Sequence, residues 1–383
     1  MQTVLRQLGF KPITLNWMSA KDMPQRRLTA SRKLKSIICG AWQKFICHKP
    51  DAWLRPWIGN PDSPLYYDKI CDENFLAHAA ELRRNCVYTA SFIRKHIHLT
   101  FPVSYETFPE KAAAYTGFKH YIVGSDQVWR GSYYPDIKVC FLNFLPTQNT
   151  AKKVAYAASF GQNWLDGYTD SDVQQATNLL QRFDAVSLRE ESGMTLCQNE
   201  LQRQDALWKP DPTLLLTADD YRKVFSAKTE KEKKLFCYIL DDTREKAMMR
   251  EKIAKKFGLE IDLFQLPDKK HHFPARPVEE WLAGINSASF VIADSFHGIV
   301  FSIIFRKNFI AVGNEKRGLT RFLSLLKMFR LEHRLVQSLS DVTDELINTP
   351  IDYCEVDQIH MYLRNEARKW LKDALEQEGC KNA

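Results

Sequence analysis

The chain has 383 residues, of which 45% are hydrophobic and 26% are charged, and its formal net charge is +8. This composition is ordinary for a folded globular protein and argues against a disordered chain, while the length predicts more than one hydrophobic core. No stretch reaches the roughly 18 apolar residues of a membrane span, and the N-terminus lacks the apolar segment of a secretory signal, so we expect a cytoplasmic protein.

The positive charge is concentrated in the first 60 residues, which hold eleven lysines and arginines against two aspartates. Within this segment, apolar residues recur at helical spacing between Leu34 and Ile46, and Trp53 and Trp57 follow. The combination fits a helix lying on an anionic membrane surface. A solvated basic face on a helix that packs against the protein explains the same pattern. No nucleic-acid recognition motif accompanies the basic residues, so we do not expect nucleic acid as a partner.

Beyond residue 100, the hydrophobic pattern alternates between strands and helices and predicts parallel, helix-covered sheets. The predicted strands are 121–123, 139–144, 154–158, 185–188, 235–240, 260–264, 290–293 and 308–312, and the predicted helices are 171–183, 244–257, 278–288, the segment after Gly298, 319–329 and about 357–377. Pro210 and Pro212 break the pattern. We therefore place an N-terminal α/β domain at 1–215, a C-terminal α/β domain at 216–350 and a C-terminal helix at 351–383.

The segment 289–306 is the most informative part of the chain. An apolar strand, Phe290 to Ala293, ends at Asp294-Ser295-Phe296-His297-Gly298, and a helix follows. A helix N-terminus offers unpaired N–H groups and the positive end of the helix dipole, which suit a phosphate or carboxylate. A histidine stands at this terminus, and its side chain titrates near neutrality. Ligands of parallel sheets bind at the carboxyl ends of the strands, where this segment lies.

The same reasoning selects two other strand ends. Ser125, Asp126 and Gln127 follow the strand at 121–123, and Arg189 follows the strand at 185–188. Each signal is weak alone, because Arg189 is also explained as a surface arginine, Asp126 as a helix cap and His297 as a core histidine. The chain lacks the glycine-rich loops of dinucleotide and P-loop sites. The nine cysteines are scattered without metal-ligand spacing, so we expect free thiols and no metal.

Six short motifs in order make the chain similar to a known family. They are Tyr121–Trp129, Tyr156–Gly161, Val186–Ser192, Asp211–Leu215, Asp294–Ser302 and Arg317–Phe322. Together they resemble the polysaccharide pyruvyl transferase family. The resemblance implies two Rossmann-like domains arranged as in GT-B glycosyltransferases, phosphoenolpyruvate as donor with no cofactor, and a sugar acceptor that receives a pyruvate ketal across two hydroxyls. It also implies a role in the synthesis of bacterial capsule, exopolysaccharide or cell wall, with acceptors that are in part lipid-linked, at the inner face of the membrane.

The N-terminus departs from this family. Members usually open with a strand and an Asn-Tyr-Gly-type turn, whereas Gln2 to Gly9 already has the pattern of the first helix, followed by a strand at 12–17. We therefore expect the first strand to be missing and the chain to be a shortened reading of a longer product.

The chemistry of the implied reaction assigns roles to the strand-end residues. His297 is expected to act as general acid or to contact phosphate, and Asp126 to act as base or to orient an acceptor hydroxyl. Arg189 is expected to bind an anion bidentately, with the N–H groups of Phe296 to Gly298 completing the site and Ser295, Ser125 and Gln127 binding substrate. Two other functions stay open, a GT-B glycosyltransferase that uses a nucleotide sugar and a non-catalytic membrane-surface protein.

Overall fold

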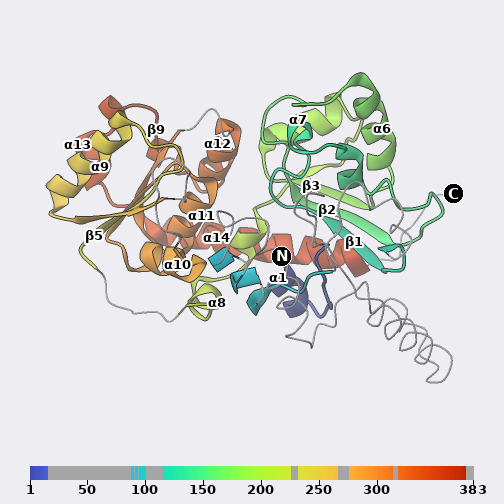
Figure 1. The fold of residues 1–383 in the computed structure, drawn as a ribbon, viewed down its shortest axis with the longest axis horizontal. Coiled ribbons are helices and arrows are strands. Elements are labelled where there is room, and N and C mark those ends of the chain that lie inside the picture. Colours follow the sequence, from blue (N-terminus) through green and yellow to red (C-terminus); the bar gives the residue numbers. More distant parts are fainter. Residues whose placement is uncertain are drawn as a thin grey trace, which may run out of the picture. The chain divides into compact units, whose positions relative to one another are not determined.

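The structure is a computed structural model that describes residues 1–15, 88–100 except 90 and 94, 115–225, 232–265, 276–313 and 318–376. The chain divides into two compact units, one of residues 118–143 and 148–383, which also takes in Met1, and a second of residues 2–117 and 144–147. Both sheets belong to the first unit (Figure 1). The domain limits predicted at 215 and 350 stay a prediction.

The second unit contains the short N-terminal helix α1 (Gln2–Gln7), as predicted. The Gln2 amide donates hydrogen bonds of 2.7 Å to Thr14 Oγ1 and to the His98 carbonyl. Thr14 pairs with Leu99 in a parallel bridge, and the predicted strand at 12–17 is described only up to residue 15. The basic helix and the two tryptophans predicted to meet a membrane lie outside the described residues.

The first sheet is parallel throughout and consists of β1 (His120–Val123), β2 (Lys152–Ala158), β3 (Ala185–Leu188) and β4 (Leu207–Trp208), in that order. Residues 154–158 of β2 are completely buried, as expected for a central parallel strand covered on both faces. Helix α6 (Asp170–Leu180) precedes β3, and α7 (Glu191–Asn199) follows it. Strand β4 has only two residues, too short for the hydrophobic pattern to predict.

The prediction of a strand at 139–144 is wrong, because the chain forms the 3-10 helix η6 (Ile137–Phe141) here. The Asp136 carboxylate caps the N–H of Lys138, and Leu142 ends the helix in the left-handed conformation. Ile137 and Phe141 are both buried, and the Phe141 ring stacks on Trp129 at 4.8 Å. An aspartate cap and aromatic packing therefore override the β-propensity of this apolar run.

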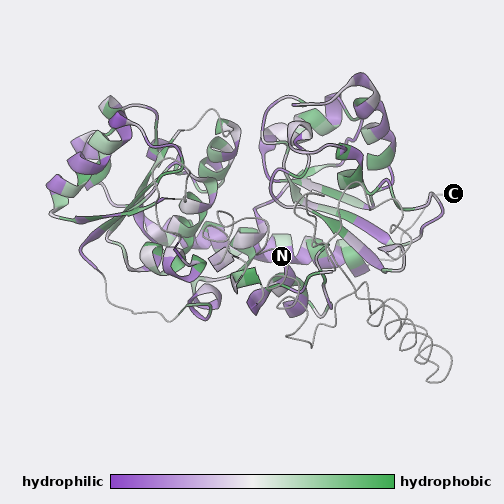
Figure 2. Cartoon of the chain, in the orientation of Figure 1, coloured by the Kyte–Doolittle hydropathy of each residue, from purple (hydrophilic) through white to green (hydrophobic). Residues whose placement is uncertain are grey.

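The second sheet is also parallel, with the order β6-β5-β7-β8-β9. Its strands are β5 (Lys234–Tyr238), β6 (Glu260–Phe264), β7 (Phe290–Ala293), β8 (Asn308–Val312) and β9 (Leu335–Val336). Its helices are α9 (Arg244–Phe257), α10 (Val278–Ser287), α11 (Phe296–Ile304) and α12 (Leu319–Met328). Hydrophobic residues occur along the strands of both sheets (Figure 2). The prediction of an α/β chain with two Rossmann-like parallel sheets is confirmed.

The remaining elements are shorter, apart from the last helix. They are η5 (Gly131–Tyr133), η7 (Pro212–Leu215), α8 (Ala218–Arg222), η9 (Glu332–Arg334), η10 (Leu339–Asp341), α13 (Asp344–Asn348) and α14 (Tyr353–Glu376). Helix α14 packs against β2 and η7, where His360 Nε2 lies 2.8 Å from the Leu214 carbonyl. At its start, the Tyr353 hydroxyl donates a hydrogen bond to the carbonyl of Lys307, which directly precedes β8. Among the described residues, no helix is long and apolar enough to span a membrane.

The turn between β7 and α11 is fixed by a buried ion pair. Asp294 is fully buried, and its carboxylate accepts hydrogen bonds from the N–H groups of Leu240 and Asp241 and from Lys246 Nζ at 2.7 Å. These contacts tie the end of β7 to the segment after β5. Every residue of α11 except His297 is buried, so this helix is anchored on all sides and presents one side chain to solvent.

Replacing Gly284 tests how tightly the helices cover the second sheet. A Cβ on Gly284 of α10 would lie 2.3 Å from the ring of Phe236, which is fully buried on β5. We expect Gly284→Ala to lower the free energy of unfolding by about 1–3 kcal/mol despite the helix propensity of alanine. Urea denaturation measures this change. Gly117→Ala, where a Cβ meets no atom within 4 Å, is the control and should be near neutral; equal effects would contradict the packing.

Candidate active site

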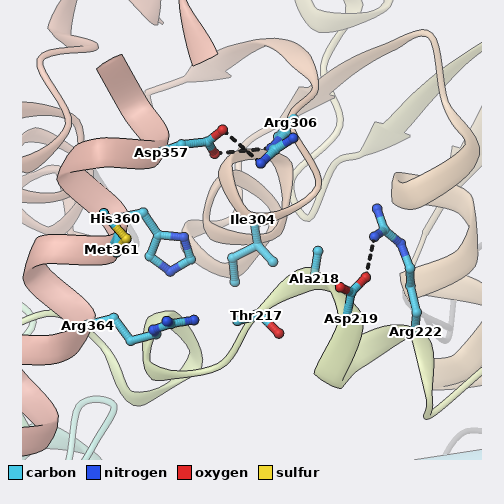
Figure 3. A pocket seen from close by; sticks show the side chains of 10 residues that line it. All are labelled: Thr217, Ala218, Asp219, Arg222, Ile304, Arg306, Asp357, His360, Met361 and Arg364. Carbon is cyan, nitrogen blue, oxygen red and sulfur yellow. Dashed lines mark hydrogen bonds and ion pairs between the residues drawn. The ribbon is translucent and has the colours of Figure 1, made fainter. Parts of the chain in front are cut away.

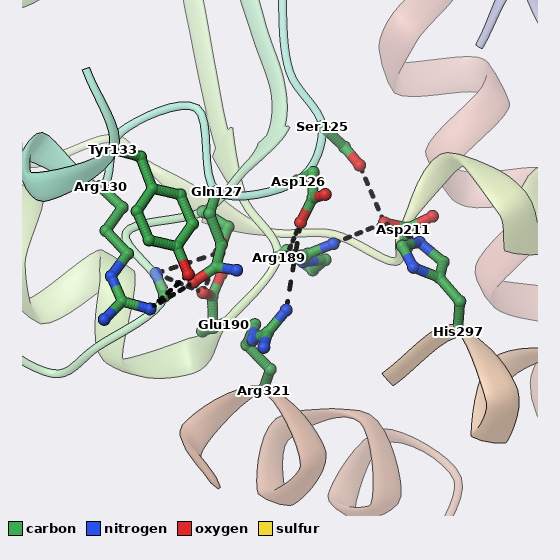
Figure 4. Close-up of polar contacts among 12 residues, drawn as sticks. Ser125, Asp126, Gln127, Arg130, Tyr133, Arg189, Glu190, Asp211, His297 and Arg321 are labelled. Atoms are coloured by element: carbon green, nitrogen blue, oxygen red, sulfur yellow. Dashed lines mark hydrogen bonds and ion pairs between the residues drawn. The ribbon is translucent and has the colours of Figure 1, made fainter. Parts of the chain in front are cut away.

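A buried carboxylate, Asp211, lies at the centre of a polar cluster (Figure 4). Its Oδ2 accepts a hydrogen bond of 2.8 Å from Ser125 Oγ and one of 3.1 Å from Arg189 Nη1, and it lies 3.8 Å from His297 Nε2. Its Oδ1 accepts from the N–H and the hydroxyl of Thr213, which fixes the carboxylate at the start of η7. Ser125, Arg189 and His297 follow β1, β3 and β7. One carboxylate therefore joins the carboxyl ends of strands from both sheets.

Asp211 is ionised despite its burial. Burial raises its pKa, but His297, Arg189 and the N–H of Thr213 stabilise the charged form and hold the pKa well below the usual value of 3.8. A buried charge with this many partners is stable only while the partners remain in place. The carboxylate therefore fixes the geometry of the cluster.

Arg189 is buried, so the interpretation as a surface arginine is wrong. Its Nη2 donates a hydrogen bond of 3.0 Å to Asp126 Oδ1, opposite its contact with Asp211. The guanidinium also lies over the ring of Phe296, 4.5 Å from its centroid. Burial lowers the pKa of Arg189, but the negative charges of Asp211, Glu190 and Asp126 outweigh this effect and raise it. The residue predicted to bind an anion thus already holds two carboxylates.

A second arginine, Arg321 on α12, extends the cluster and was not selected from the sequence. Its Nη1 lies 4.0 Å from Asp126 Oδ1, and its guanidinium is 5.9 Å from the centroid of the Phe296 ring. Burial, followed by the like charge of Arg189, lowers the pKa of Arg321 to about 10. Two buried guanidiniums thus share one exposed carboxylate, an arrangement that favours a further anion.

Close backbone packing brings α12 to this position. Gly318, which precedes α12, has a φ of +90°, and a Cβ there would lie 2.1 Å from the Gly161 carbonyl oxygen beyond β2. Only glycine permits both the conformation and the approach. Ser324 Oγ of α12 accepts a hydrogen bond from the N–H of Glu191, and Lys327 pairs with the Glu191 carboxylate at 2.6 Å. These contacts hold α12 against the start of α7.

Asp126 and His297 are the members of the cluster that reach solvent. The Asp126 side chain is 64% exposed, and that of His297 is 36% exposed. Partial desolvation raises the pKa of Asp126, but the charges of Arg189, His297 and Arg321 outweigh it and lower the pKa. Asp126 also has a φ of +61° and heads no helix, so it does not serve as a helix cap. The exposure of His297 likewise argues against a core histidine.

The other residues predicted to bind substrate have mixed surroundings. Gln127 Oε1 accepts a hydrogen bond of 3.0 Å from Arg130 Nη1 and packs against Gly161. Ser295 is the N-cap residue of α11, although its side chain makes no capping hydrogen bond. Gly298 lies where a Cβ would be 2.8 Å from the Ala293 side chain, so it allows α11 to pack closely on β7. The structure thus gathers Ser125, Asp126, Arg189, Phe296 and His297 and gives Gly298 a packing role.

Glu190 is a buried acid at the edge of the cluster. Its Oε1 contacts Ser159 Oγ and accepts a hydrogen bond of 3.1 Å from the N–H of Gly161, whereas its buried Oε2 has no hydrogen-bond partner among the described residues. Burial raises the pKa of Glu190 despite the opposing effects of Arg189 and Ser159. An unpartnered buried carboxylate oxygen is costly in the ionised form, which accounts for the raised pKa.

A pocket of about 430 Å³ lies elsewhere, between α8, the end of α11 and α14 (Figure 3). Its charged lining is largely paired within itself, because Arg306 Nη2 lies 2.8 Å from Asp357 and Arg222 Nη1 lies 2.8 Å from Asp219. None of the strand-end residues lines it. The strand-end cluster is the better candidate site, because it combines a titratable side chain with buried guanidiniums and solvent access.

The comparisons with known proteins point to one family. The model of the polysaccharide pyruvyl transferase family matches residues 36–316. No curated protein matches the chain. Among solved structures, the chain is similar to the wall teichoic acid polymerase TagF, with 10% sequence identity, a TM-score of 0.35, and coverage of 91% of this chain and 100% of that chain. At this TM-score the likeness carries no argument about the site.

Removing the central carboxylate should destabilise the fold. We expect Asp211→Asn to lower the free energy of unfolding near neutral pH by about 3 kcal/mol, because Arg189 loses a buried counter-ion. Because the pKa of Asp211 is depressed in the folded state, its contribution is present above the unfolded value near 3.8 and is lost as the pH falls through the folded pKa. Denaturation curves of both proteins should therefore converge in acid. The control is Asp219→Asn, which breaks the ion pair with Arg222. Because the Asp219 side chain is 82% exposed, this change should lower the free energy of unfolding by less than about 1 kcal/mol.

The raised pKa of Glu190 predicts an opposite pH dependence of stability. A raised folded pKa gives stability that is present below the unfolded value of 4.5 and is lost as the pH rises through the folded pKa. Glu190→Gln mimics the protonated acid, so its melting temperature should increase relative to wild type as the pH rises. A difference that stays constant from acid to alkaline pH would show that folding does not raise the pKa of Glu190.

Proposed function

Since the chain belongs to the polysaccharide pyruvyl transferase family, we propose that it transfers the enolpyruvyl group of phosphoenolpyruvate to two hydroxyls of a sugar, forming a pyruvate ketal and releasing phosphate. The observation that carries this proposal is the single cluster in which His297 lies 3.8 Å from Asp211 while Asp211 binds Arg189. The proposed setting is the synthesis of bacterial surface polysaccharide at the inner face of the membrane, with phosphoenolpyruvate as donor substrate and no cofactor.

The donor requires a proton and an anion site. The methylene carbon of phosphoenolpyruvate must be protonated so that C2 develops positive charge, and a solvent-accessible imidazole beside a carboxylate is suited to this transfer. Asp211 orients the ring of His297 and offsets its charge when it carries two protons. The guanidiniums of Arg189 and Arg321 and the N-terminus of α11 supply positive potential for the carboxylate and phosphate.

The acceptor requires a group that receives hydrogen bonds from sugar hydroxyls. The exposed Asp126 carboxylate is placed for this role beside the arginines. A first hydroxyl adds to C2 of the protonated donor, and a second hydroxyl adds as the bond between C2 and the phosphate oxygen breaks. Of the two hydroxyl protons, one replaces the proton given to the methylene carbon and the other leaves with the phosphate. Asp126 orients the hydroxyl more readily than it removes its proton, because the arginines lower its pKa.

An assay of the full chain separates this function from its alternatives. Purified protein is incubated with phosphoenolpyruvate and candidate sugars, free or lipid-linked, and in parallel with nucleotide sugars. Release of phosphate together with a pyruvate ketal on the sugar supports the proposal. Transfer of a glycosyl group from a nucleotide sugar, or the lack of turnover with both donors, contradicts it.

His297 provides the decisive variant. We expect His297→Ala to lower turnover by roughly 10²- to 10⁴-fold, the usual contribution of a general acid, while the protein stays folded. His333→Ala, which removes an exposed histidine outside the cluster, is the matched control and should retain activity. A rate for His297→Ala within threefold of the control would remove His297 from the mechanism.

A further inference from the structure

Asp126 holds an unusual position with respect to the two arginines of the site. Its carboxylate lies 3.0 Å from Arg189 Nη2 and 4.0 Å from Arg321 Nη1. The aspartate side chain is 64% exposed, whereas those of the two arginines are 1% and 8% exposed. Both cations are thus buried, and the anion that faces them lies on the solvent side.

Among the described residues, the solvent-facing side of the arginine pair is the side on which Asp126 lies. The Phe296 ring lies against both guanidiniums, at 4.5 Å and 5.9 Å. Asp211 occupies another side of Arg189 and is itself fixed by Ser125 and Thr213. An incoming anion that reaches both arginines therefore meets Asp126 first.

We propose that Asp126 occupies the place of a ligand's anionic group on the arginine pair and is displaced when the carboxylate or phosphate of the donor binds. The inference rests on the proposed use of an anionic donor and deepens it. Asp126 already lies against both arginines, so a donor anion added beside an unmoved Asp126 would bring like charges together. Arg189 keeps Asp211 as a counter-ion after the exchange.

The exchange has a consequence for the acceptor. Once it leaves the arginines, the Asp126 carboxylate loses the charges that lower its pKa and becomes a better hydrogen-bond acceptor for a sugar hydroxyl. Donor binding thereby prepares the acceptor side. The two substrates should then bind in order, with the anionic donor first.

Neutralising Asp126 shows which role it has: an anion that competes with the donor, a group that binds substrate, or a purely structural residue. Asp126→Asn keeps the size of the side chain and suits the φ of +61°, because asparagine tolerates the left-handed region. Isothermal calorimetry with the full chain measures binding of inorganic phosphate and, separately, of phosphoenolpyruvate. We expect the affinity of the variant for both anions to increase by roughly three- to tenfold while turnover falls, as for the loss of a competing ion pair. Asp126→Gly, which also suits this φ, should shift affinity in the same direction.

A matched control is available in Asp205, which is 67% exposed and pairs with the buried Arg203 outside the cluster. Asp205→Asn removes the same charge and should leave both affinities unchanged. Unchanged or weaker phosphate binding by Asp126→Asn and Asp126→Gly would overturn the inference. Tighter phosphate binding without any binding of phosphoenolpyruvate would support the displaced carboxylate and would contradict the proposed donor, so the two ideas fail separately.

Discussion

The buried carboxylate of Asp211 is the interaction on which the candidate site depends. It is ionised inside the protein because Ser125, Arg189, Thr213 and His297 surround it, and those partners come from segments that follow β1, β3, β4 and β7. Parallel sheets bring polar residues to the carboxyl ends of their strands, but they do not fix the distances between side chains. Here one charge sets those distances, because each partner loses a favourable contact if it moves.

A second constraint is the pairing of charges around the arginines. Arg189 and Arg321 lie against the same aromatic ring, and their mutual repulsion is relieved by Asp126. This balance makes the unliganded site stable while leaving its outer carboxylate exchangeable. A site of this kind binds anions through buried cations that are already in place, so the arginines need not move when the ligand arrives.

The sequence predicted the fold well where the hydrophobic period was clear. The limits of α9, β6, β7 and β8 agree with their predicted ranges, because each has a clear hydrophobic period with glycine, threonine or polar residues at its ends. The segment 137–141 was mispredicted, because its helical turn depends on Asp136 and on packing against Trp129, which no local period reveals. Ser125, Asp126, Arg189 and His297 were selected because they follow strands, and the structure brings these four together.

Asp211 and Arg321 were missed for a physical reason. Asp211 stands between two prolines in a segment that reads as a break between domains, and Arg321 lies within an amphipathic helix where a basic residue usually faces solvent. Both residues belong to the short motifs that resemble the family, and these motifs were the signal that could have identified them.

Determination of the structure with phosphoenolpyruvate bound tests the central claim most directly. We expect the anionic groups of the donor to contact Arg321 and lie beside His297, with the Asp126 carboxylate turned away from Arg189 and the contact between Asp211 and Arg189 retained. A donor bound elsewhere, such as in the pocket between α8 and α14, with Asp126 still paired to Arg189, would contradict it.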